Sequence, residues 1–593
     1  MWLKSRMPVG GAIALGLILA GCAPAAQIPV PPSQSAPGAP QPAGPIPTAS
    51  PAIQRAPTPT LGIPTPPPAP AASTSPSAVQ RGGTLSLVFV SEPPHWDPYQ
   101  SVKYIHLWDY IGDSLLNYEP KNGEPQPQLV ESWEYVNPTT LVLHIRKSVR
   151  WHNLPPVNGR ELVADDVVWS IQRLSRPGAT YPWKGRFERI AKVEATDKYT
   201  VRLTLKSPFA PLLNYLRGSP FPYQPMLPRE VEDKYGTDGF KDPEHAVGTG
   251  PFMTKSYTPS VGGAFVRNPD YWRSGLPYLN SLQVYVVPDE ATLIAAYRAG
   301  KIDYGVDTVG GVDLPQKQNL ERTKPNLGFT AIPSARPMGI SMNLRKAPFD
   351  NVMLRKALFL ATDRQEALTV NLGGGGHISG PISWKMFPGW TWTEDELLKR
   401  EGYRPKNTPE GQADITEAQR IMRELGYGPN NPLVLQAEGC KCFPFINLTN
   451  MEVAKSDWKK IWVDVQGIKI FDQAQFFDQD ATGNWSLRAR AYVAGLEPDD
   501  QLYTRYYTGA GRNYIGLSDR EIDRLLDQQR AELDGAKRKP IIREIQDKLW
   551  LHYPVIWLHV DELYSVRQPW VRNLEPTAWR LWGDTATVWV SGK

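Results

Sequence analysis

The chain has 593 residues, of which 41% are hydrophobic and 21% are charged, and its formal net charge is +5. This composition is typical of folded globular proteins and excludes a wholly disordered chain, a collagen and a protein with many membrane spans. Residues 1–80 contain three basic and no acidic side chains, so the remaining residues carry a formal net charge of only +2. A nearly neutral body lacks the basic surface of nucleic-acid-binding proteins, and we expect no nucleic-acid partner.

The first 22 residues have the pattern of an export signal. Lys4 and Arg6 precede an apolar run over residues 9–20, which is too short to cross a bilayer but has the size of a signal-peptide core. The run ends in Leu19-Ala20-Gly21-Cys22, which resembles a bacterial lipobox. We therefore predict a lipoprotein signal peptide over residues 1–22, with lipid attachment at Cys22 as the means of membrane association. The alternative is an ordinary signal peptide in which Cys22 occurs by chance.

Residues 23–80 differ sharply from the rest of the chain. They hold 18 prolines in 58 positions, one charged residue, Arg55, and no aromatic residue. Such a segment cannot bury enough apolar surface to fold, and its prolines favour extended polyproline II. We predict a disordered tether that holds a folded body away from a membrane.

The remaining two cysteines are Cys440 and Cys442. An exported protein can form disulfides, but the short Cys-Lys-Cys loop strains the geometry of such a bridge. Two cysteines without histidines at ligand spacing make a poor zinc site. The sequence leaves open whether these cysteines form a disulfide or stay as thiols.

Strand and helix patterns are interleaved after residue 80. In chain order, they predict strands over 84–90 and 139–146, a helix over 161–174, a hairpin over 193–205, and helices over 289–299, 416–425, 518–526 and 541–550. Asp289 is expected to cap its helix, and Ser518 with Glu521 to form a capping box. The elements follow no fixed repeat, so the predicted class is α/β or mixed α+β.

The sequence offers no convincing motif for covalent chemistry, since Ser456-Asp-Trp-Lys459 matches Ser-x-x-Lys without the Lys-Thr-Gly that should accompany it. It contains no His-Glu-x-x-His pattern for a zinc hydrolase and no Gly-x-Ser-x-Gly elbow for a serine hydrolase. The four glycines at 373–376 lack the Lys-Ser/Thr pair of a phosphate-binding loop and indicate a turn. Glu497, Asp499 and Asp500 are more consistent with a solvated loop than with a metal site. We expect no enzymatic activity, no cofactor and no metal.

Tryptophan is the most unusual component of the composition. The chain has 20 tryptophans, and only Trp2 precedes the folded body. Most are expected in the core, because each large ring buries 150–250 Å². A minority are expected to line a pocket, where flat apolar walls suit small organic ligands, sugars included.

The order of several segments resembles a known family. The segments are 125–151 (PQPQLVESWEYVNPTTLVLHIRKSVRW), 164–168 (ADDVV), 247–252 (VGTGPF), 267–272 (RNPDYW), 277–279 (PYL), 348–350 (PFD), 354–358 (LRKAL), 372–381, 424–428 (ELGYG) and 513–525. Together they are similar to the family-5 solute-binding proteins of ABC importers, the class that binds dipeptides, oligopeptides or nickel. The resemblance covers about residues 81–565.

The resemblance implies a bilobed periplasmic-binding-protein fold of the large three-domain type. Lobe I would be discontinuous, formed by residues 81–124, 246–335 and 565–593. A smaller domain II, residues 125–245, would attach to it, and lobe III would span residues 336–564. A hinge would join the two lobes, and the ligand would lie in the cleft between them.

The resemblance also implies ligand-binding positions, which we list as expectations: Glu92, Trp96, Tyr181, Trp183, Trp384, Gln475, Tyr492, Glu497 and Asp499. One position departs from the family pattern. Peptide-binding members place an Asp about three residues before an acidic-Pro pair to hold the α-ammonium, and here the pair is Glu497-Pro498 and the position is Ala494. Either Glu497, Asp499 or Asp500 replaces that Asp, or the ligand has no free α-amine.

The function implied by the resemblance is capture of a small solute and its delivery to an ABC transporter permease. The expected protein is a monomer, exported and anchored by its lipid in the periplasm or on the outer cell surface. Peptide is the family's usual ligand, and an oligosaccharide or another polar solute remains an alternative. Two other functions compete with this one. The chain could be a sensory or adhesive lipoprotein, or an exported hydrolase that uses a carboxylate pair.

Overall fold

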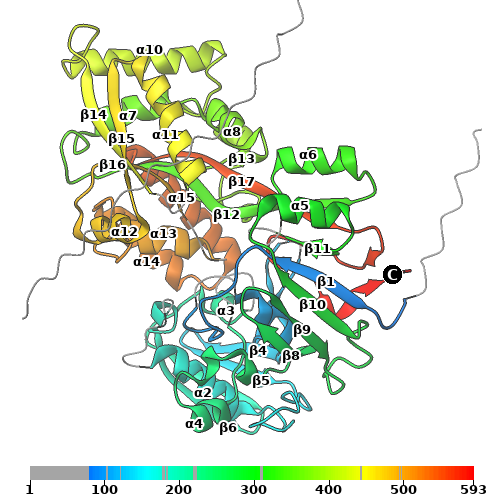
Figure 1. The fold of residues 1–593 in the computed structure, drawn as a ribbon. Helices are drawn as coiled ribbons and strands as arrows, with labels where there is room; N and C mark the ends of the chain where they lie inside the picture. The colour runs from blue at the N-terminus through cyan, green and yellow to red at the C-terminus, as the bar shows by residue number, and fades with distance from the viewer. Residues whose placement is uncertain are drawn as a thin grey trace, which may run out of the picture. The chain divides into compact units, whose positions relative to one another are not determined.

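A computed structural model of the chain describes residues 79–101, 105–120, 122–176, 181, 184–217, 224–306, 311–440, 444–492, 495, 497–581 and 583–592 (Figure 1). The chain separates into two units, Met1–Ser75 and Pro76–Lys593, and the described residues belong to the second. The predicted signal peptide and nearly all of the predicted tether lie outside them.

A mixed sheet of eleven strands runs through the second unit. Its order is β15-β14-β16-β12-β17-β11-β1-β10-β9-β8, and β13 pairs with β17. The strands are β1 Thr84–Phe89, β8 Phe252–Thr258, β9 Gly262–Arg267, β10 Ser281–Val286, β11 Tyr304–Gly305, β12 Gly328–Met342, β13 Gly376–Ile378, β14 Leu433–Cys440, β15 Val463–Phe471, β16 Leu487–Ala491 and β17 Val555–Arg567.

Two long strands at the centre of the sheet connect its halves. β12 and β17 pair antiparallel and together reach from β11 on one side to β16 on the other. Their pairing shifts register between Pro333 and Pro337 and again between Pro337 and Gly339. Proline has no N–H to donate to the ladder, so this sequence interrupts the regular pairing where the halves of the sheet meet.

A second, four-stranded antiparallel sheet has the order β4-β5-β7-β6. Its strands are β4 Val130–Asn137, β5 Thr140–Ile145, β6 Ile190–Asp197 and β7 Thr200–Leu205. The helices that accompany it are α2 Ala164–Ser175, α3 Leu212–Tyr215 and α4 Arg229–Tyr235. We call this group the small domain.

Two further two-stranded ribbons pair β2 Leu116–Tyr118 with β3 Pro125–Pro127, and β18 Val571–Arg572 with β19 Trp589–Val590.

The other helices lie on the two halves of the large sheet. The first half carries α1 Trp108–Ile111, α5 Glu290–Arg298 and α6 Leu314–Thr323. The second half carries α7 Val352–Ala361, α8 Arg364–Leu372, α9 Glu394–Leu397, α10 Pro409–Glu424, α11 Pro444–Lys459, α12 Gln473–Thr482, α13 Pro498–Tyr506, α14 Arg520–Ala531 and α15 Gly535–His552. Within the described residues, no helix is both long and apolar enough to cross a bilayer.

Two large hydrophobic cores define two lobes. The first core is built from residues 85–332 and 571–590 and includes the small domain. The second core is built from residues 340–558, with Tyr118 and Trp579 added from outside that range. We call the elements on these cores the first and second lobe. The first lobe is discontinuous in sequence, because the chain enters the second lobe through β12 and returns through β17.

Most predicted elements are confirmed, with differences at helix starts. Asp289 caps α5 by accepting a bond from the Thr292 N–H. α10 begins at Pro409, seven residues before its predicted start, because Thr408 caps it and proline is favourable in a first turn. α15 begins at Gly535, six residues early, and contains Pro540, although proline usually ends a helix.

The predicted capping box at Ser518 is wrong. α14 begins at Arg520, and Asp519 is its cap, accepting bonds from the N–H groups of Glu521 at 2.8 Å and Ile522 at 3.0 Å. Asp519 also accepts a bond from His552 Nε2 at 2.9 Å. The predicted inward face is correct, since Ile522, Leu525 and Leu526 are buried. Cys440, at the end of β14, is disulfide-bonded, and Cys442 lies outside the described residues.

We predict that Asp519→Ala lowers the free energy of unfolding by about 1 kcal/mol or more, because two backbone donors lose their acceptor. Ser518→Ala is the matched control and should change stability by less than about 0.5 kcal/mol. Urea titrations of both variants measure the difference. Equal losses for the two substitutions would contradict the assignment of Asp519 as the cap.

Candidate functional site

Three acidic residues mark the place where the small domain meets the second lobe. Glu497 is the N-cap of α13, and Asp499 and Asp500 lie in its first turn, with Pro498 between them. This sequence begins a helix well, because proline fits the first helical position and carboxylates favour the positive end of the helix dipole. All three carboxylates are buried, so each needs compensation.

Two of the carboxylates pair with arginines of their own lobe. Glu497 pairs with Arg538 of α15 and also accepts a bond from Asn214 of α3. Asp499 pairs with Arg530 of α14, whose Nη2 lies 2.7 Å from Oδ2. These pairs fix α13 against α14 and α15.

The third carboxylate is compensated from the first lobe. Asp500 Oδ2 lies 2.6 Å from Nη2 of Arg186, which belongs to the small domain. Asp500 Oδ1 accepts a bond from the Tyr215 hydroxyl at 3.1 Å. Asp500 therefore joins the first turn of α13 to Arg186 and Tyr215, which are each more than 280 residues away in the sequence.

Burial governs the protonation of this group. It raises the pKa of Asp500, although Arg186 acts in the opposite direction, and the neighbouring Asp499 raises it further. Burial and repulsion from Asp500 and Asp499 also hold the pKa of Tyr215 well above its usual range. Tyr215 thus remains protonated and donates its hydrogen to Asp500.

The backbone at this place leaves no room for additional atoms. A Cβ on Gly495 would lie 2.0 Å from Asp500 Oδ2 and 2.3 Å from Arg186 Nη2. Across the same contact, the Ala210 N–H donates to the Arg530 carbonyl at 2.7 Å. We call this contact, formed by residues 184–189 and 206–215 on one side and 495–530 on the other, the seam.

A second contact between the lobes is aromatic. Trp579 packs edge-on against Phe387 of the second lobe, with ring centroids 5.2 Å apart. Tyr118 lies 5.8 Å from Trp579, and the Arg217 guanidinium lies 4.0 Å from the centre of the Tyr118 ring. Through this aromatic contact, Tyr118 and Trp579 of the first lobe become part of the second hydrophobic core.

The seam borders an open cavity of about 650 Å³, which is the size of a site for a small organic molecule. Seven of its lining residues come from the first lobe and seven from the second. They are Gly185, Arg186, Glu188, Arg189, Lys206, Phe209 and Tyr215, and Asp500, Tyr503, Thr504, Ala510, Gly511, Arg512 and Arg530.

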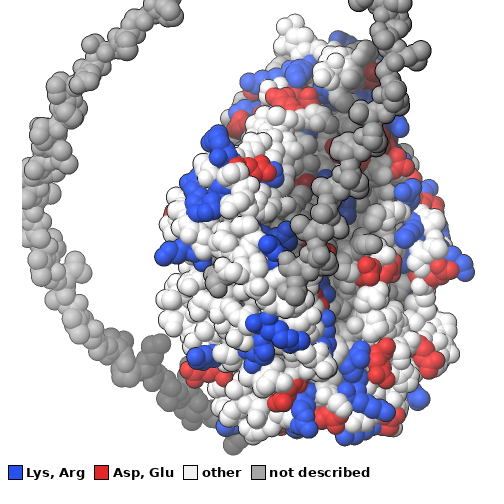
Figure 2. Space-filling view, turned by 90° about the vertical axis from the view of Figure 1, so that its right-hand side faces the viewer, with Lys and Arg blue, Asp and Glu red and all other residues white. Residues whose placement is uncertain are grey.

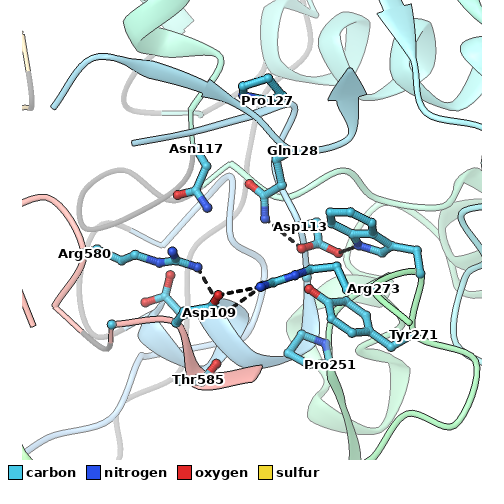
Figure 3. A pocket seen from close by; sticks show the side chains of 14 residues that line it. Asp109, Asp113, Asn117, Pro127, Gln128, Pro251, Tyr271, Arg273, Arg580 and Thr585 are labelled. Carbon is cyan, nitrogen blue, oxygen red and sulfur yellow. Dashed lines mark hydrogen bonds and ion pairs between the residues drawn. The ribbon is translucent and has the colours of Figure 1, made fainter. Parts of the chain in front are cut away.

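A smaller cavity of about 260 Å³ lies within the first lobe (Figure 3). Asp584 lies between Arg273, at 2.7 Å, and Arg580, at 3.3 Å. Asp113 accepts bonds from Trp272, Thr249 and Gln128. None of the predicted ligand-binding residues lines this cavity, and its Asp113 and Asp584 are already bonded to neighbouring side chains, so we do not assign the ligand site to it.

Several predicted residues lie at or near the seam. Glu497 and Asp499 belong to it, as the ion pairs above show. Tyr181 is buried, accepts a bond from Gln224 Nε2 at 2.5 Å, and packs 6.4 Å from Phe187, the neighbour of Arg186. The structure therefore brings Tyr181, Glu497 and Asp499 to one region.

Two further predicted residues lie beside β17 in the second lobe. Tyr492 bonds to the Ser341 hydroxyl, and its ring lies 4.4 Å from that of Trp557. Trp384 packs edge-on against His377 at 5.3 Å, next to the ion pair of Lys385 with Glu562. The buried Trp384 Nε1 has no hydrogen-bond partner within the described part of the chain.

The remaining predicted residues are separate from these groups. Glu92 accepts bonds from the Tyr257 hydroxyl at 2.8 Å and the Ser260 N–H at 3.0 Å in the β8–β9 hairpin. Trp96 is buried in the first core, and Gln475 is exposed in the first turn of α12. Trp183, Ala494 and Cys22 lie outside the described residues.

The sequence pattern gives no indication of the partners of the acidic residues. Arg186, Asn214, Tyr215, Arg530 and Arg538 were not predicted as site residues, because they are distant in sequence and follow no motif. The one signal in the sequence is the cluster of three carboxylates, which needs nearby cations if it is buried. The described residues contain no group of three or more His, Cys, Asp or Glu side chains that could hold a metal ion.

Comparisons with known proteins agree on one class. A family model described as "Bacterial extracellular solute-binding proteins, family 5 Middle" matches residues 124–514. Di/tripeptide-binding protein 1 of Pseudomonas aeruginosa is 24% identical over 527 residues, covering 82% of this chain and 91% of that protein. Glutathione-binding protein GsiB of Salmonella typhimurium is 26% identical over 444 residues, covering 72% and 78%.

The fold has relatives among solved structures. The periplasmic binding protein DppA of Helicobacter pylori, solved with the peptide STSA, superimposes with a TM-score of 0.68 at 21% identity. The match covers 86% of this chain and 98% of DppA. At this level of identity the likeness shows the fold, and it confirms the predicted bilobed α/β architecture.

We predict that Arg186→Ala and Asp500→Ala each lower the free energy of unfolding by about 3 kcal/mol, because each leaves a buried charge without its partner. The double variant should lose at least about 1 kcal/mol less than the sum of the two, since it leaves neither charge. Urea titrations of the four proteins give the coupling.

The exposed pair Lys192–Glu194 of β6 is the control for this cycle, with side chains 64% and 35% exposed. Its coupling energy should be below about 1 kcal/mol. Additive effects at Arg186 and Asp500 would show that the seam pair does not link the lobes.

Proposed function

Because the chain belongs to the bacterial extracellular solute-binding proteins of family 5, we propose that it captures a small solute between its two lobes and delivers it to the permease of an ABC importer. The family consists of binding proteins, so the chain is not an enzyme. The observation that carries the proposal is the seam, where Arg186 of the first lobe and Asp500 of the second form a buried ion pair.

Ligand capture in such a protein works through closure of the lobes. A solute that contacts both lobes favours the closed arrangement by its difference in affinity for the closed and open states. β12 and β17 are suited to act as the hinge, because their pairing is irregular between Pro333 and Gly339. We propose that the permease recognises the closed arrangement.

We propose the following domain division: lobe I from residues 81–124, 246–335 and 565–593, domain II from 125–245, and lobe III from 336–564. The two large cores support it, because the first draws on residues before 333 and after 570 and the second on residues 340–558. The register shifts of β12 lie at the proposed boundary near residue 335.

The charged groups of the seam bear on the class of solute that the protein captures. Relatives named for di- and tripeptides and for glutathione make a peptide the first candidate. Glu497 and Asp499 are already paired with Arg538 and Arg530, so neither offers an uncompensated carboxylate to an α-ammonium. This observation favours a second candidate, a solute without a free α-amine, for which an oligosaccharide is one possibility.

We further propose that the protein is exported and anchored by lipid at Cys22, with residues 23–80 as the tether. The supporting observations are the lipobox pattern and the proline-rich composition of the sequence. Two or three acyl chains hold a protein at a membrane stably, whereas one chain binds only reversibly.

We predict that Cys22→Ala moves the full-length protein from the membrane fraction to the soluble fraction, because it removes the site of lipid attachment. Affinity for solute should stay within about twofold of wild type, as measured on the purified protein. Membrane association that persists in the variant would disprove the lipid anchor without affecting the solute-binding proposal.

We also predict that the protein purified from its own host carries solute. Native mass spectrometry should give an intact mass above that of the denatured chain, because a ligand enclosed between closed lobes leaves only when they open. Released peptides would support the first candidate, and an amine-free compound the second. A protein that carries no solute and binds none from an extract of host nutrients would contradict the proposed function.

A further inference from the structure

A further open cavity lies on the first lobe, away from the seam. It has a volume of about 630 Å³ and is lined by Arg81, by residues between β5 and α2, and by the loop between β9 and β10. Three of its lining residues are basic, Arg81, Arg150 and Arg267, and one is acidic, Asp270. We call this cavity the arginine groove. Its formal net charge of +2 equals that of all residues 81–593 together.

The three arginines are held by the backbone and not by carboxylates. Each donates to a carbonyl oxygen: Arg81 Nη1 to Gly275 at 2.6 Å, Arg150 Nη1 to Gly159 at 2.9 Å, and Arg267 Nη2 to Tyr278 at 2.7 Å. Among the described residues, none of the three forms an ion pair. A neutral carbonyl fixes the position of a guanidinium without cancelling its charge. Since a guanidinium has five N–H donors, each arginine also keeps donors for another acceptor.

Carboxylates near the groove have other partners. Glu161 accepts a bond from the Ser148 N–H at 2.8 Å and forms an ion pair with Lys198 at 2.9 Å. Asp584 pairs with Arg273, which follows the lining residue Trp272, at 2.7 Å. Asp270 is therefore the one acid of the lining, and the groove offers its excess positive charge to a partner outside the chain.

The folded body begins at the edge of this groove. The Gly82 N–H donates to the Tyr278 carbonyl at 2.8 Å, and the Asn280 N–H donates to the Gly83 carbonyl at 3.0 Å, so residues 82–83 run along the β9–β10 loop. Val79 and Gln80, which come just before, are exposed. The proposed tether, residues 23–80, thus ends directly before Arg81, and the body is attached where its unpaired arginines lie.

Exposed arginines elsewhere on the protein are paired. On the face of the molecule in Figure 2, basic and acidic side chains are interspersed. Arg229 of α4, Arg420 of α10 and Arg524 of α14 are 64%, 51% and 56% exposed, and each forms an ion pair with a carboxylate of its own helix. These three arginines match those of the groove in charge and differ from them in having carboxylate partners, so they serve as controls.

We propose that the arginine groove docks on an anionic membrane surface by binding the phosphate groups of its lipids. Guanidinium groups bind phosphate well, and each basic residue close to an anionic bilayer strengthens binding by about fivefold. The tether would keep the groove near the membrane, so a weak contact is sufficient. The inference goes beyond solute capture, and it uses the proposed lipid anchor only to explain that sufficiency. The contact alone is weak and reversible by salt, so Cys22→Ala protein is still expected in the soluble fraction.

Co-sedimentation of the full-length Cys22→Ala protein with vesicles tests the proposal without the lipid anchor. We expect binding to phosphatidylcholine vesicles with about 30% phosphatidylglycerol to be at least about tenfold stronger than to phosphatidylcholine alone, because only the former are anionic. Raising the salt concentration to about 500 mM should remove the difference, since salt screens the charges.

Adding Arg81→Gln, Arg150→Gln and Arg267→Gln to this protein should weaken binding to the anionic vesicles at least about tenfold. Adding Arg229→Gln, Arg420→Gln and Arg524→Gln instead removes the same number of charges and should change binding less than about threefold, because those charges are already paired. Lysine at the three groove positions keeps the charge and loses the shape of the guanidinium. That variant should stay within about threefold of the parent, which separates loss of charge from loss of folding.

Four results would overturn the inference. The first three are equal binding to the two kinds of vesicle, equal binding of the groove and control glutamine variants, and a loss in the lysine variant as large as in the glutamine variant. The fourth is release from the vesicles by millimolar glycerol phosphate at constant ionic strength, because the groove would then bind a free phosphate ester and not a surface.

The outcome is separate from that of the proposed function. If the protein retains solute from its host and any of the four results is found, solute capture stands and the membrane contact fails. If the groove arginines control vesicle binding and no solute is retained or bound, solute capture fails instead.

Discussion

The buried ion pair between Arg186 and Asp500 is the interaction on which the arrangement of the two lobes depends. Of the three carboxylates at the start of α13, Glu497 and Asp499 find their arginines within the second lobe, and Asp500 finds its arginine in the first. A charge buried in protein is tolerated when a partner compensates it. Contact between the lobes supplies that partner, so folding of α13 and approach of the small domain are energetically linked.

The rest of the seam follows from the same constraint. Tyr215 donates a hydrogen bond to the second carboxylate oxygen of Asp500. Its raised pKa keeps the hydroxyl protonated, so it remains a donor. Gly495 is needed where the chain passes the ion pair, because a Cβ there would overlap both side chains. The seam is therefore held by polar groups whose geometry is specific, while the contact of Trp579 with Phe387 adds apolar burial elsewhere.

In the proposed function, solute capture and contact between the lobes share residues of the seam. The carboxylates that could have held a ligand's ammonium are used to fix α13 and the seam, and five of the fourteen residues that line the nearby cavity are basic. The chain thus places positive charge where both lobes meet, although its folded body is close to neutral.

The sequence by itself determined the local elements and the class of protein. Helical spacing of Ile522, Leu525 and Leu526 identified the buried face of α14, and Asp289 was recognisable as a cap, because both signals act over a few residues. The ordered segments between residues 125 and 525 identified the family, which the family model over 124–514 confirms. The cap at Asp519 was misplaced by one residue, since Ser518 and Asp519 are both good caps and the adjacent His552 is seen only in the fold.

Only the tertiary structure decided what the acidic residues do. In the sequence, Glu497, Asp499 and Asp500 are equivalent members of a loop that could face solvent or an ammonium. Their roles differ because Arg538, Arg530 and Arg186 approach them from three different elements, the last from more than 300 residues away. Burial and partners of a charge are set by long-range packing, and a single sequence carries no local pattern for contacts at that separation.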